Sequence, residues 1–275
     1  MEKYLYHYTS IDTLLLILKN KTLAFNSLQN VDDLEEADSE DIEQIGKICY
    51  VSCWTNDDSE SIPMWNMYTP NMQGVRIKLK EYPFKKYFYK KGEYFFNTDC
   101  ESHINYKDLY SDDKACISPD SPLLRNVIYT EEKSKLYPRI KSVIKKAEKL
   151  DNGKININEK IKYSFEELGK YKRSNWSFQN EVRYIINMAP YSMKELMSCK
   201  SEAEQRKLIS RLEDTKIKAP YKRFFLQLSD EALKNIEVLL GPKITEEQEE
   251  IVKLIIDKYC PSAKILNSNL KGKLL

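Results

Sequence analysis

Short apolar stretches alternate with polar turns along this chain and predict interleaved strands and helices. The opening YLYHY is aromatic and alternates in polarity, so we expect a strand over residues 3–8. Thr9 or Ser10 then offers a hydroxyl cap for an apolar helix that begins near Ile11. By the same pattern, further strands are expected at 22–27, 47–54, 74–80, 181–188, 221–228, 236–243 and 263–269.

Helical patterns lie between these strands. They are expected at 64–69 and 192–213, and in an amphipathic segment opened by Thr245. We interpret 131–150 and 158–173 as two further helices, both rich in lysine and separated by DNGK. The pattern predicts a single α+β domain over 1–275, with a mixed central sheet, peripheral helices and a basic helical insertion at about 131–173.

Charge is balanced over the whole chain but not within it. The sequence has 44 basic and 42 acidic residues, a net charge of +2 that favours no class of partner. Residues 133–173 are strongly basic and could follow a phosphate backbone, which would indicate a nucleic-acid target. Such a run is also typical of a solvated surface.

Cysteine usage and hydropathy bear on location. The six cysteines are scattered and form no CxxC pair, so we expect no structural zinc site and a reducing environment. No basic-then-apolar leader opens the chain, and no apolar run is long enough to cross a bilayer. These features predict a cytoplasmic protein without a membrane partner.

Few familiar catalytic groupings fit this sequence. It has two histidines, His7 and His103, and no GxSxG motif, which leaves little room for a serine triad or a histidine-rich metal site. The acids between Asp32 and Glu36 could bind a divalent cation, as in a metal-dependent nuclease. They could equally be favoured at a helix start by the helix dipole.

Two other groupings could line a cleft. Glu181 and Arg183 alternate on a predicted strand and share one face, so they are either a buried pair at a cleft or a surface ion pair on an edge strand. Trp65 and Tyr68 share one face of a short helix, where they could wall a ligand or plug the sheet edge.

The order of these motifs resembles a known family. YHYTS, an apolar helix, the loop NVDDLE, MWNMYTPNMQGV, WSFQNEVR and a strand ending in GPK occur in an order that resembles the bacterial domain-of-unknown-function family 2971. The resemblance covers most of the chain, and 81–170 is the poorest match. The family name implies no activity.

A looser similarity does imply one. A strand that ends in histidine and a hydroxyl, followed by an apolar helix, is similar to the start of the ADP-ribosyltransferase fold. The similarity implies that His7 and Thr9 bind a ribose of NAD, that Tyr68 or Trp65 stacks on nicotinamide, and that Glu181 is the catalytic carboxylate. The residues we assign to NAD binding are His7, Tyr8, Thr9, Ser10, Trp65, Tyr68 and Arg183.

We therefore expect an ADP-ribosyltransferase-like enzyme or NAD glycohydrolase that cleaves the nicotinamide–ribose bond of NAD. It would be a toxin or phage-defence effector that modifies a macromolecule, either a nucleic acid or a protein, or that only consumes NAD. NAD would be a substrate, no metal is expected, and His7 and Glu181 should face one cleft. The main alternative is a non-catalytic nucleotide or nucleic-acid binding module, in which Glu181 and Arg183 are a structural pair and His7 only fills space. A metal-dependent nuclease is the third.

Overall fold

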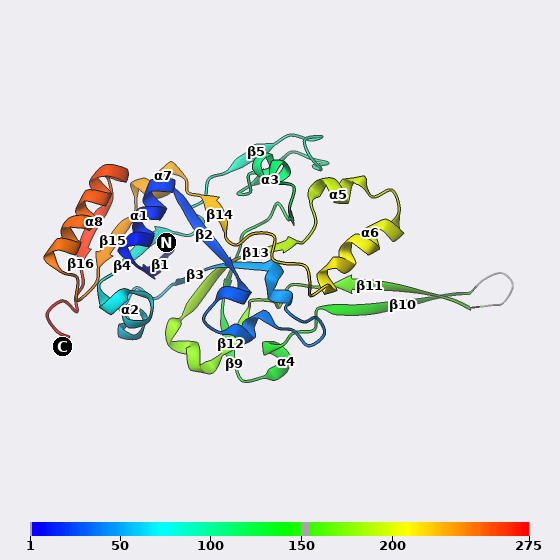
Figure 1. Cartoon of the computed structure of the whole chain (residues 1–275), viewed down its shortest axis with the longest axis horizontal. Coiled ribbons are helices and arrows are strands. Elements are labelled where there is room, and N and C mark those ends of the chain that lie inside the picture. Colours follow the sequence, from blue (N-terminus) through cyan, green and yellow to red (C-terminus); the bar gives the residue numbers. More distant parts are fainter. Residues whose placement is uncertain (1, 150–154, 275) are drawn as a thin grey trace.

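A mixed sheet lies at the centre of the molecule in this computed structural model, which describes residues 2–149 and 155–274 (Figure 1). Its strands are β1 (Tyr4–Thr9), β2 (Thr22–Ser27), β3 (Cys49–Thr55), β4 (Val75–Lys80), β7 (Cys116–Ile117), β8 (Leu123–Asn126), β13 (Glu181–Ala189), β14 (Phe224–Gln227), β15 (Glu237–Leu240) and β16 (Lys264–Asn267). The strand order is β14-β2-β3-β1-β4-β15-β16, and β13 joins β3 to β7 and β8. Only β15 and β16 pair in parallel among the described strands of this sheet.

Helices surround the sheet, so the α+β class predicted from the sequence is confirmed. They are α1 (Ile11–Asn20), α2 (Ile62–Tyr68), α3 (Tyr106–Asp112), α4 (Lys133–Leu136), α5 (Met193–Ser198), α6 (Glu202–Ile209), α7 (Asp230–Lys234) and α8 (Glu246–Tyr259). Turns of 3₁₀ helix form η1 (Leu28–Asn30), η2 (Leu34–Ala37), η3 (Ile45–Ile48), η4 (Pro70–Met72), η5 (Ser174–Gln179) and η6 (Ser210–Glu213). Within the described residues, every helix is too short or too polar to span a lipid bilayer.

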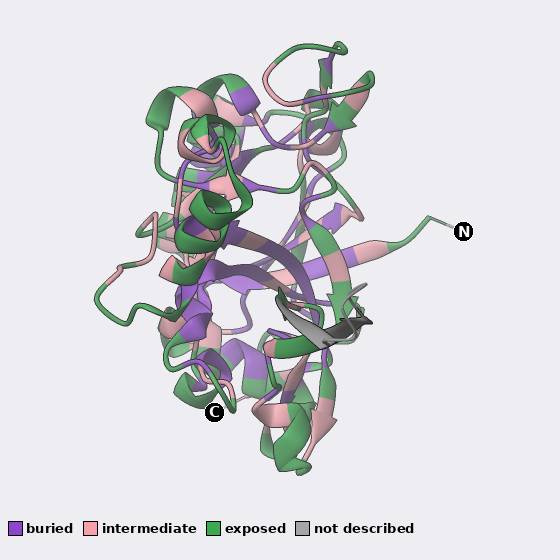
Figure 2. Ribbon diagram, turned by 90° about the vertical axis from the view of Figure 1, so that its right-hand side faces the viewer, coloured by how far each residue is buried: buried purple, intermediate pink, exposed green. Residues whose placement is uncertain are grey.

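Local sequence explains why β1 is followed directly by a helix. The Ser10 hydroxyl accepts a hydrogen bond from the Thr13 amide at 3.2 Å, which caps the first turn of α1. Leu14, Ile17 and Leu18 then face the core on one side of α1, which also packs against α8. Figure 2 shows the buried residues gathered on the central strands and the exposed ones on the helices and loops.

The basic segment is not helical, which corrects the predicted helical insertion at 131–173. After the short α4, residues form β10 (Lys141–Lys149) and β11 (Ile155–Tyr163), an antiparallel pair that extends away from the rest of the molecule (Figure 1). The segment then ends in β12 (Tyr171–Arg173), which pairs with β9 (Ile128–Thr130). The alternation of Ile155, Ile157 and Ile161 has the period of a strand and not of a helix.

A further small hairpin lies at one side of the sheet. It consists of β5 (Tyr87–Tyr89) and β6 (Cys100–Ser102), which pair antiparallel. Tyr89 and Tyr106 pack edge to face, with ring centroids 5.4 Å apart, so the hairpin is held to α3. The segment from β5 to α3 is thus held together by packed aromatic rings.

One edge of β3 is only partly paired, and this leaves an opening in the sheet. Along its other edge, β3 pairs with β13 from Cys49 to Thr55. On the open edge it meets β2 at Tyr50 and Val51 and meets β1 at Thr55 alone. The middle of β3 therefore has no ladder partner on that edge within the described residues, and β1 and β2 diverge on either side of it.

Candidate functional site

A cavity of about 320 Å³ occupies this opening; we call it the sheet cavity. β1 contributes His7 and Thr9 to its lining, and the unpaired middle of β3 contributes Ser52 and Cys53. Glu181, at the start of β13, lines the cavity as well. Segments far apart in the sequence thus meet where the sheet leaves space, as binding sites commonly do.

A smaller pocket of about 60 Å³ continues inward, and we call it the inner pocket. Its lining is largely aromatic and includes Tyr6, Tyr8, Trp54 and Tyr68. His7 and Glu181 line both this pocket and the sheet cavity. The prediction that His7 and Glu181 face one cleft is therefore confirmed, whereas their role in NAD binding stays a prediction.

His7 is held in place by a hydrogen bond to the unpaired middle of β3. Its Nδ1 donates a hydrogen bond to the Cys53 carbonyl oxygen at 2.9 Å, which satisfies a backbone acceptor in the middle of β3. The ring also packs against Trp54, with centroids 5.0 Å apart. Burial lowers the pKa of His7, so the ring is neutral at neutral pH. Because Nδ1 holds the proton, Nε2 is left as a hydrogen-bond acceptor.

Glu181 belongs to a buried cluster of two acids and two bases, which we call the charge cluster. Arg183 Nε donates to Glu181 Oε1 at 2.5 Å, and Arg183 Nη2 donates to Glu181 Oε2 at 3.0 Å. A second carboxylate, from Glu36 on η2, also contacts Arg183. Lys172 Nζ lies 3.3 Å from both Glu36 Oε1 and Glu181 Oε2. The cluster has no net charge, which is how buried ions are tolerated.

The cluster sets the ionisation of Glu181. Burial would raise the pKa of its carboxyl, but the charge and hydrogen bonds of Arg183, with the charge of Lys172, outweigh burial and lower the pKa to about 2. Glu181 is therefore a carboxylate at any physiological pH. The alternative of an exposed ion pair on an edge strand is wrong, because Arg183 is fully buried on a strand paired along both edges.

Tyr68 is held between the two cavities by a chain of hydrogen bonds. Lys172 Nζ donates to Gln179 Oε1 at 2.9 Å, and Gln179 Nε2 donates to the Tyr68 hydroxyl at 2.6 Å. That hydroxyl donates in turn to Asp32 at 2.6 Å. The ring is thus fixed as a wall, and burial together with Asp32 raises the pKa of Tyr68, so the hydroxyl stays protonated.

The structure places the other predicted site residues as follows. Tyr8 lines both cavities and Thr9 lines the sheet cavity. Ser10 caps α1 and lines neither. Trp65 is fully buried, packs edge-on against Tyr8 and donates from Nε1 to Glu60 at 3.0 Å. Ser10 and Trp65 therefore lie behind the lining of the site, and of the helix pair Trp65 and Tyr68 it is Tyr68 that lines the cavities.

The acids between Asp32 and Glu36, which lie within η2 and directly before it, do not converge. Asp32 accepts from Tyr68, Asp33 and Glu35 pair with Arg173, and Glu36 enters the charge cluster. Within residues 2–149 and 155–274, no three or more histidine, cysteine or acidic side chains are grouped so that they could hold a metal ion. The acids instead fasten this loop across the sheet cavity, where Asn30 and Asp32 form part of the wall.

Three important residues were not singled out from sequence. Lys172 and Gln179 hold Glu181 and Tyr68, and Cys53 lines both cavities. Gln179 lies two positions before Glu181, so proximity in sequence could have suggested it. Nothing distinguishes Lys172 among the many lysines of its segment. Burial raises the pKa of the Cys53 thiol, so Cys53 is not a thiolate nucleophile.

Comparison with known proteins gives one finding. Residues 64–184 match a family described as a protein of unknown function, DUF2971. The matched region includes Tyr68, Lys172, Gln179 and Glu181, and begins after His7. The comparisons find no match to the chain among curated proteins or among solved structures.

Proposed function

We propose, for a chain that matches DUF2971 over residues 64–184, that the sheet cavity binds NAD and that the protein cleaves its nicotinamide–ribose bond. The observation that supports this most is that His7 and Glu181, from the first strand and a late strand, line the same two cavities.

The residue types suit this reaction. Cleavage of a glycosidic bond passes through an oxocarbenium-like state, in which positive charge develops on the sugar. A carboxylate that is already ionised and held rigidly stabilises that charge, and Glu181 is such a group. A neutral His7 accepts a hydrogen bond from a ribose hydroxyl through Nε2 and so positions the sugar.

The nicotinamide ring fits the inner pocket by its chemistry. The pocket is lined mainly by aromatic side chains, and a flat ring stacks favourably on such walls. Tyr68 closes one side and is fixed there by Gln179 and Asp32. Release of nicotinamide would leave an ADP-ribosyl group for transfer to water or to a macromolecule. We also propose that this reaction serves a toxin or phage-defence role in the bacterial cytoplasm.

The test is incubation of the purified chain with labelled NAD, alone and with cell extract. We expect nicotinamide release, and label on a macromolecule if an acceptor is present. Glu181→Gln should lower the rate by about 10²–10³-fold, because one group that stabilises the transition state is lost. Glu237→Gln is the matched control, because Glu237 forms an ion pair with Lys78 outside both cavities.

Folding of Glu181→Gln must be verified by circular dichroism, because the substitution leaves the charge cluster with an extra positive charge. A folded variant with unchanged turnover would remove Glu181 from the reaction. Absence of nicotinamide release by the parent protein would refute the enzyme proposal as a whole.

One observation favours the alternative of a non-catalytic nucleotide-binding module. Both oxygens of Glu181 are already engaged by Arg183, and one also faces Lys172, as in a purely structural pair. On this alternative the cavity binds NAD or ADP-ribose without turnover. A titration that shows binding, with intact NAD recovered afterwards, would establish it.

A further inference from the structure

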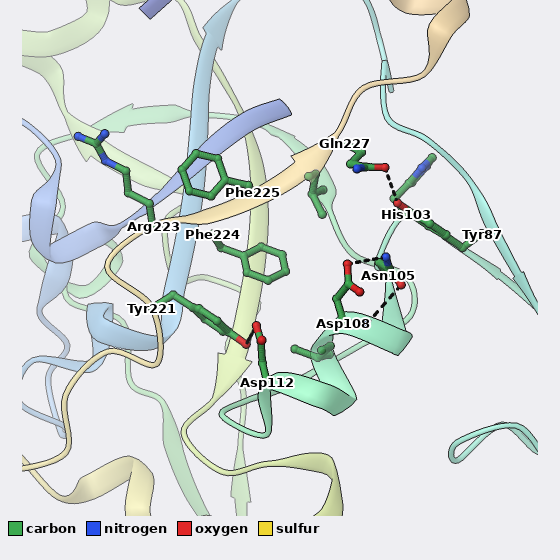
Figure 3. A pocket seen from close by; sticks show the side chains of 12 residues that line it. Tyr87, His103, Asn105, Asp108, Asp112, Tyr221, Arg223, Phe224, Phe225 and Gln227 are labelled. Atoms are coloured by element: carbon green, nitrogen blue, oxygen red, sulfur yellow. Dashed lines mark hydrogen bonds between the residues drawn. The ribbon is translucent and has the colours of Figure 1, made fainter. Parts of the chain in front are cut away.

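Arg223 lies where two cavities meet. It lines the sheet cavity and also a second cavity of about 250 Å³ beside β14, which we call the β14 groove (Figure 3). Its side chain is exposed, and it forms no hydrogen bond or ion pair with any residue of the described ranges. An unpaired guanidinium at the rim of a cavity is suited to bind an anion.

The other charges that line the sheet cavity are already satisfied. Lys172 and Arg183 neutralise the acids of the charge cluster. Asp32 accepts the Tyr68 hydroxyl. Among the described residues that line this cavity, Arg223 is thus the cation without an ion-pair partner. A dinucleotide has a diphosphate with two negative charges, and a cation at the rim of the cavity would compensate for them.

Phe225 lies beside Arg223 on the same side of the strand. The two side chains point to one side of β14, and Phe224 points to the other (Figure 3). Phe225 is paired in register with Ala24 of β2, which lines the sheet cavity. The Phe225 side chain is 52% exposed and makes no ring contact with another described aromatic residue. A bare ring of this kind is a stacking surface for a base.

We propose that the diphosphate of NAD binds Arg223 and that its adenine stacks on Phe225, so the dinucleotide extends from the inner pocket across the sheet cavity to the rim of the β14 groove. This rests on the proposed NAD activity. It assigns the adenosine half of the ligand to Arg223, directly before β14, and to Phe225 within β14, which the sequence motifs did not point to.

The test is calorimetric titration with ADP-ribose, which has the adenine and diphosphate but lacks the bond to be cleaved. Arg223→Gln should weaken binding by about 10–100-fold, the loss expected for a charge-assisted hydrogen bond. Phe225→Ala should weaken it by roughly tenfold. Lys222→Gln and Phe88→Ala are the matched controls, because both residues are exposed and line neither cavity.

Nicotinamide serves as a second probe, because it lacks both groups and its affinity should be the same in all four variants. Unchanged ADP-ribose affinity in Arg223→Gln or in Phe225→Ala would overturn the assignment of that residue, even if the parent protein releases nicotinamide from NAD. A parent protein that neither binds ADP-ribose nor consumes NAD would overturn the proposed function, and this inference with it.

Discussion

At the scale of single residues, the charge cluster holds a carboxylate ionised in a buried place. Arg183 binds Glu181 through two parallel hydrogen bonds, a geometry that also fixes the orientation of the carboxylate. Lys172 sits over Trp176, with Nζ 4.7 Å from the ring centroid, and approaches both acids. Removal of any one charge leaves an unpaired ion away from water, which costs far more than an exposed pair.

Lys172→Met should therefore destabilise the protein by about 3 kcal/mol, because Glu36 and Glu181 are left with one positive charge between them. Urea denaturation measures the change. Lys80→Met is the control, because Lys80 pairs with Glu2 at the surface, where the loss of an ion pair changes stability little. Equal changes in the free energy of unfolding for the two substitutions would show that the charge cluster contributes no more to stability than a surface ion pair.

The pH dependence follows from the pKa of Glu181, which falls from an ordinary value of 4.5 to about 2. A carboxyl with a lowered pKa contributes stability that is fully present above the ordinary value and is lost as pH falls through the folded value. NAD cleavage should accordingly show no acid limb from Glu181 between pH about 5 and about 8. A rate profile with an acid limb between pH about 5 and about 8 that disappears in Glu181→Gln would contradict this.

At the scale of elements, the sequence predicted those whose pattern is local. The alternation of YLYHYT, the hydroxyl of Ser10 and the apolar face of α1 each act within a few residues, and β1 and α1 form where expected. The hairpin β10–β11 forms where the sequence predicted helices, although Ile155 and Ile157 alternate with the period of a strand and Asn152-Gly153 is a turn signal in the sequence.

The candidate site was only half accessible from sequence. His7 and Glu181 were found because each lies in a compact motif. Glu36, Lys172 and Gln179 act only through tertiary contacts, since the loop, β12 and η5 must all fold against β13 before their side chains meet. Trp65 and Tyr68 could not be told apart by helical spacing, because only the packing shows which ring faces the cavity.

The β10–β11 hairpin should be separable from the cavity. It joins the body at its base, where Lys141 pairs with Glu213 at 2.9 Å and the Ile140 amide donates to Asp41. Replacing residues 143–161 by a short Asn-Gly turn should leave the thermal midpoint within a few degrees and leave turnover of free NAD unchanged.

If the basic hairpin recruits a nucleic acid, the parent protein should shift nucleic acid on a gel in a salt-dependent way, and the deletion variant should give no gel shift. Parent protein that binds no nucleic acid at any salt concentration would show that this segment is a solvated surface. Loss of NAD turnover in the folded deletion variant would instead place the hairpin in the site.

At the scale of the whole molecule, the sheet consists of two parts. β1, β4, β15 and β16 form one part, and β3 with β13, β7, β8, β2 and β14 forms the other. Between β1 and β3, the ladder joins them through the single pair Tyr6–Thr55. The sheet cavity lies across this junction and takes side chains from both parts, since His7 comes from one and Glu181 from the other.

Because of this junction, ligand binding should change how cooperatively the two parts of the sheet unfold. Two parts joined by one ladder pair can open to solvent with different free energies, which native-state hydrogen exchange resolves as two classes of amide protection. A ligand that touches both parts stabilises only the state in which both are closed. Saturating ADP-ribose should therefore slow exchange in β4 and in β13 together and merge the two classes. A single class in the free protein, or protection confined to one part, would mean that the ligand does not bridge them.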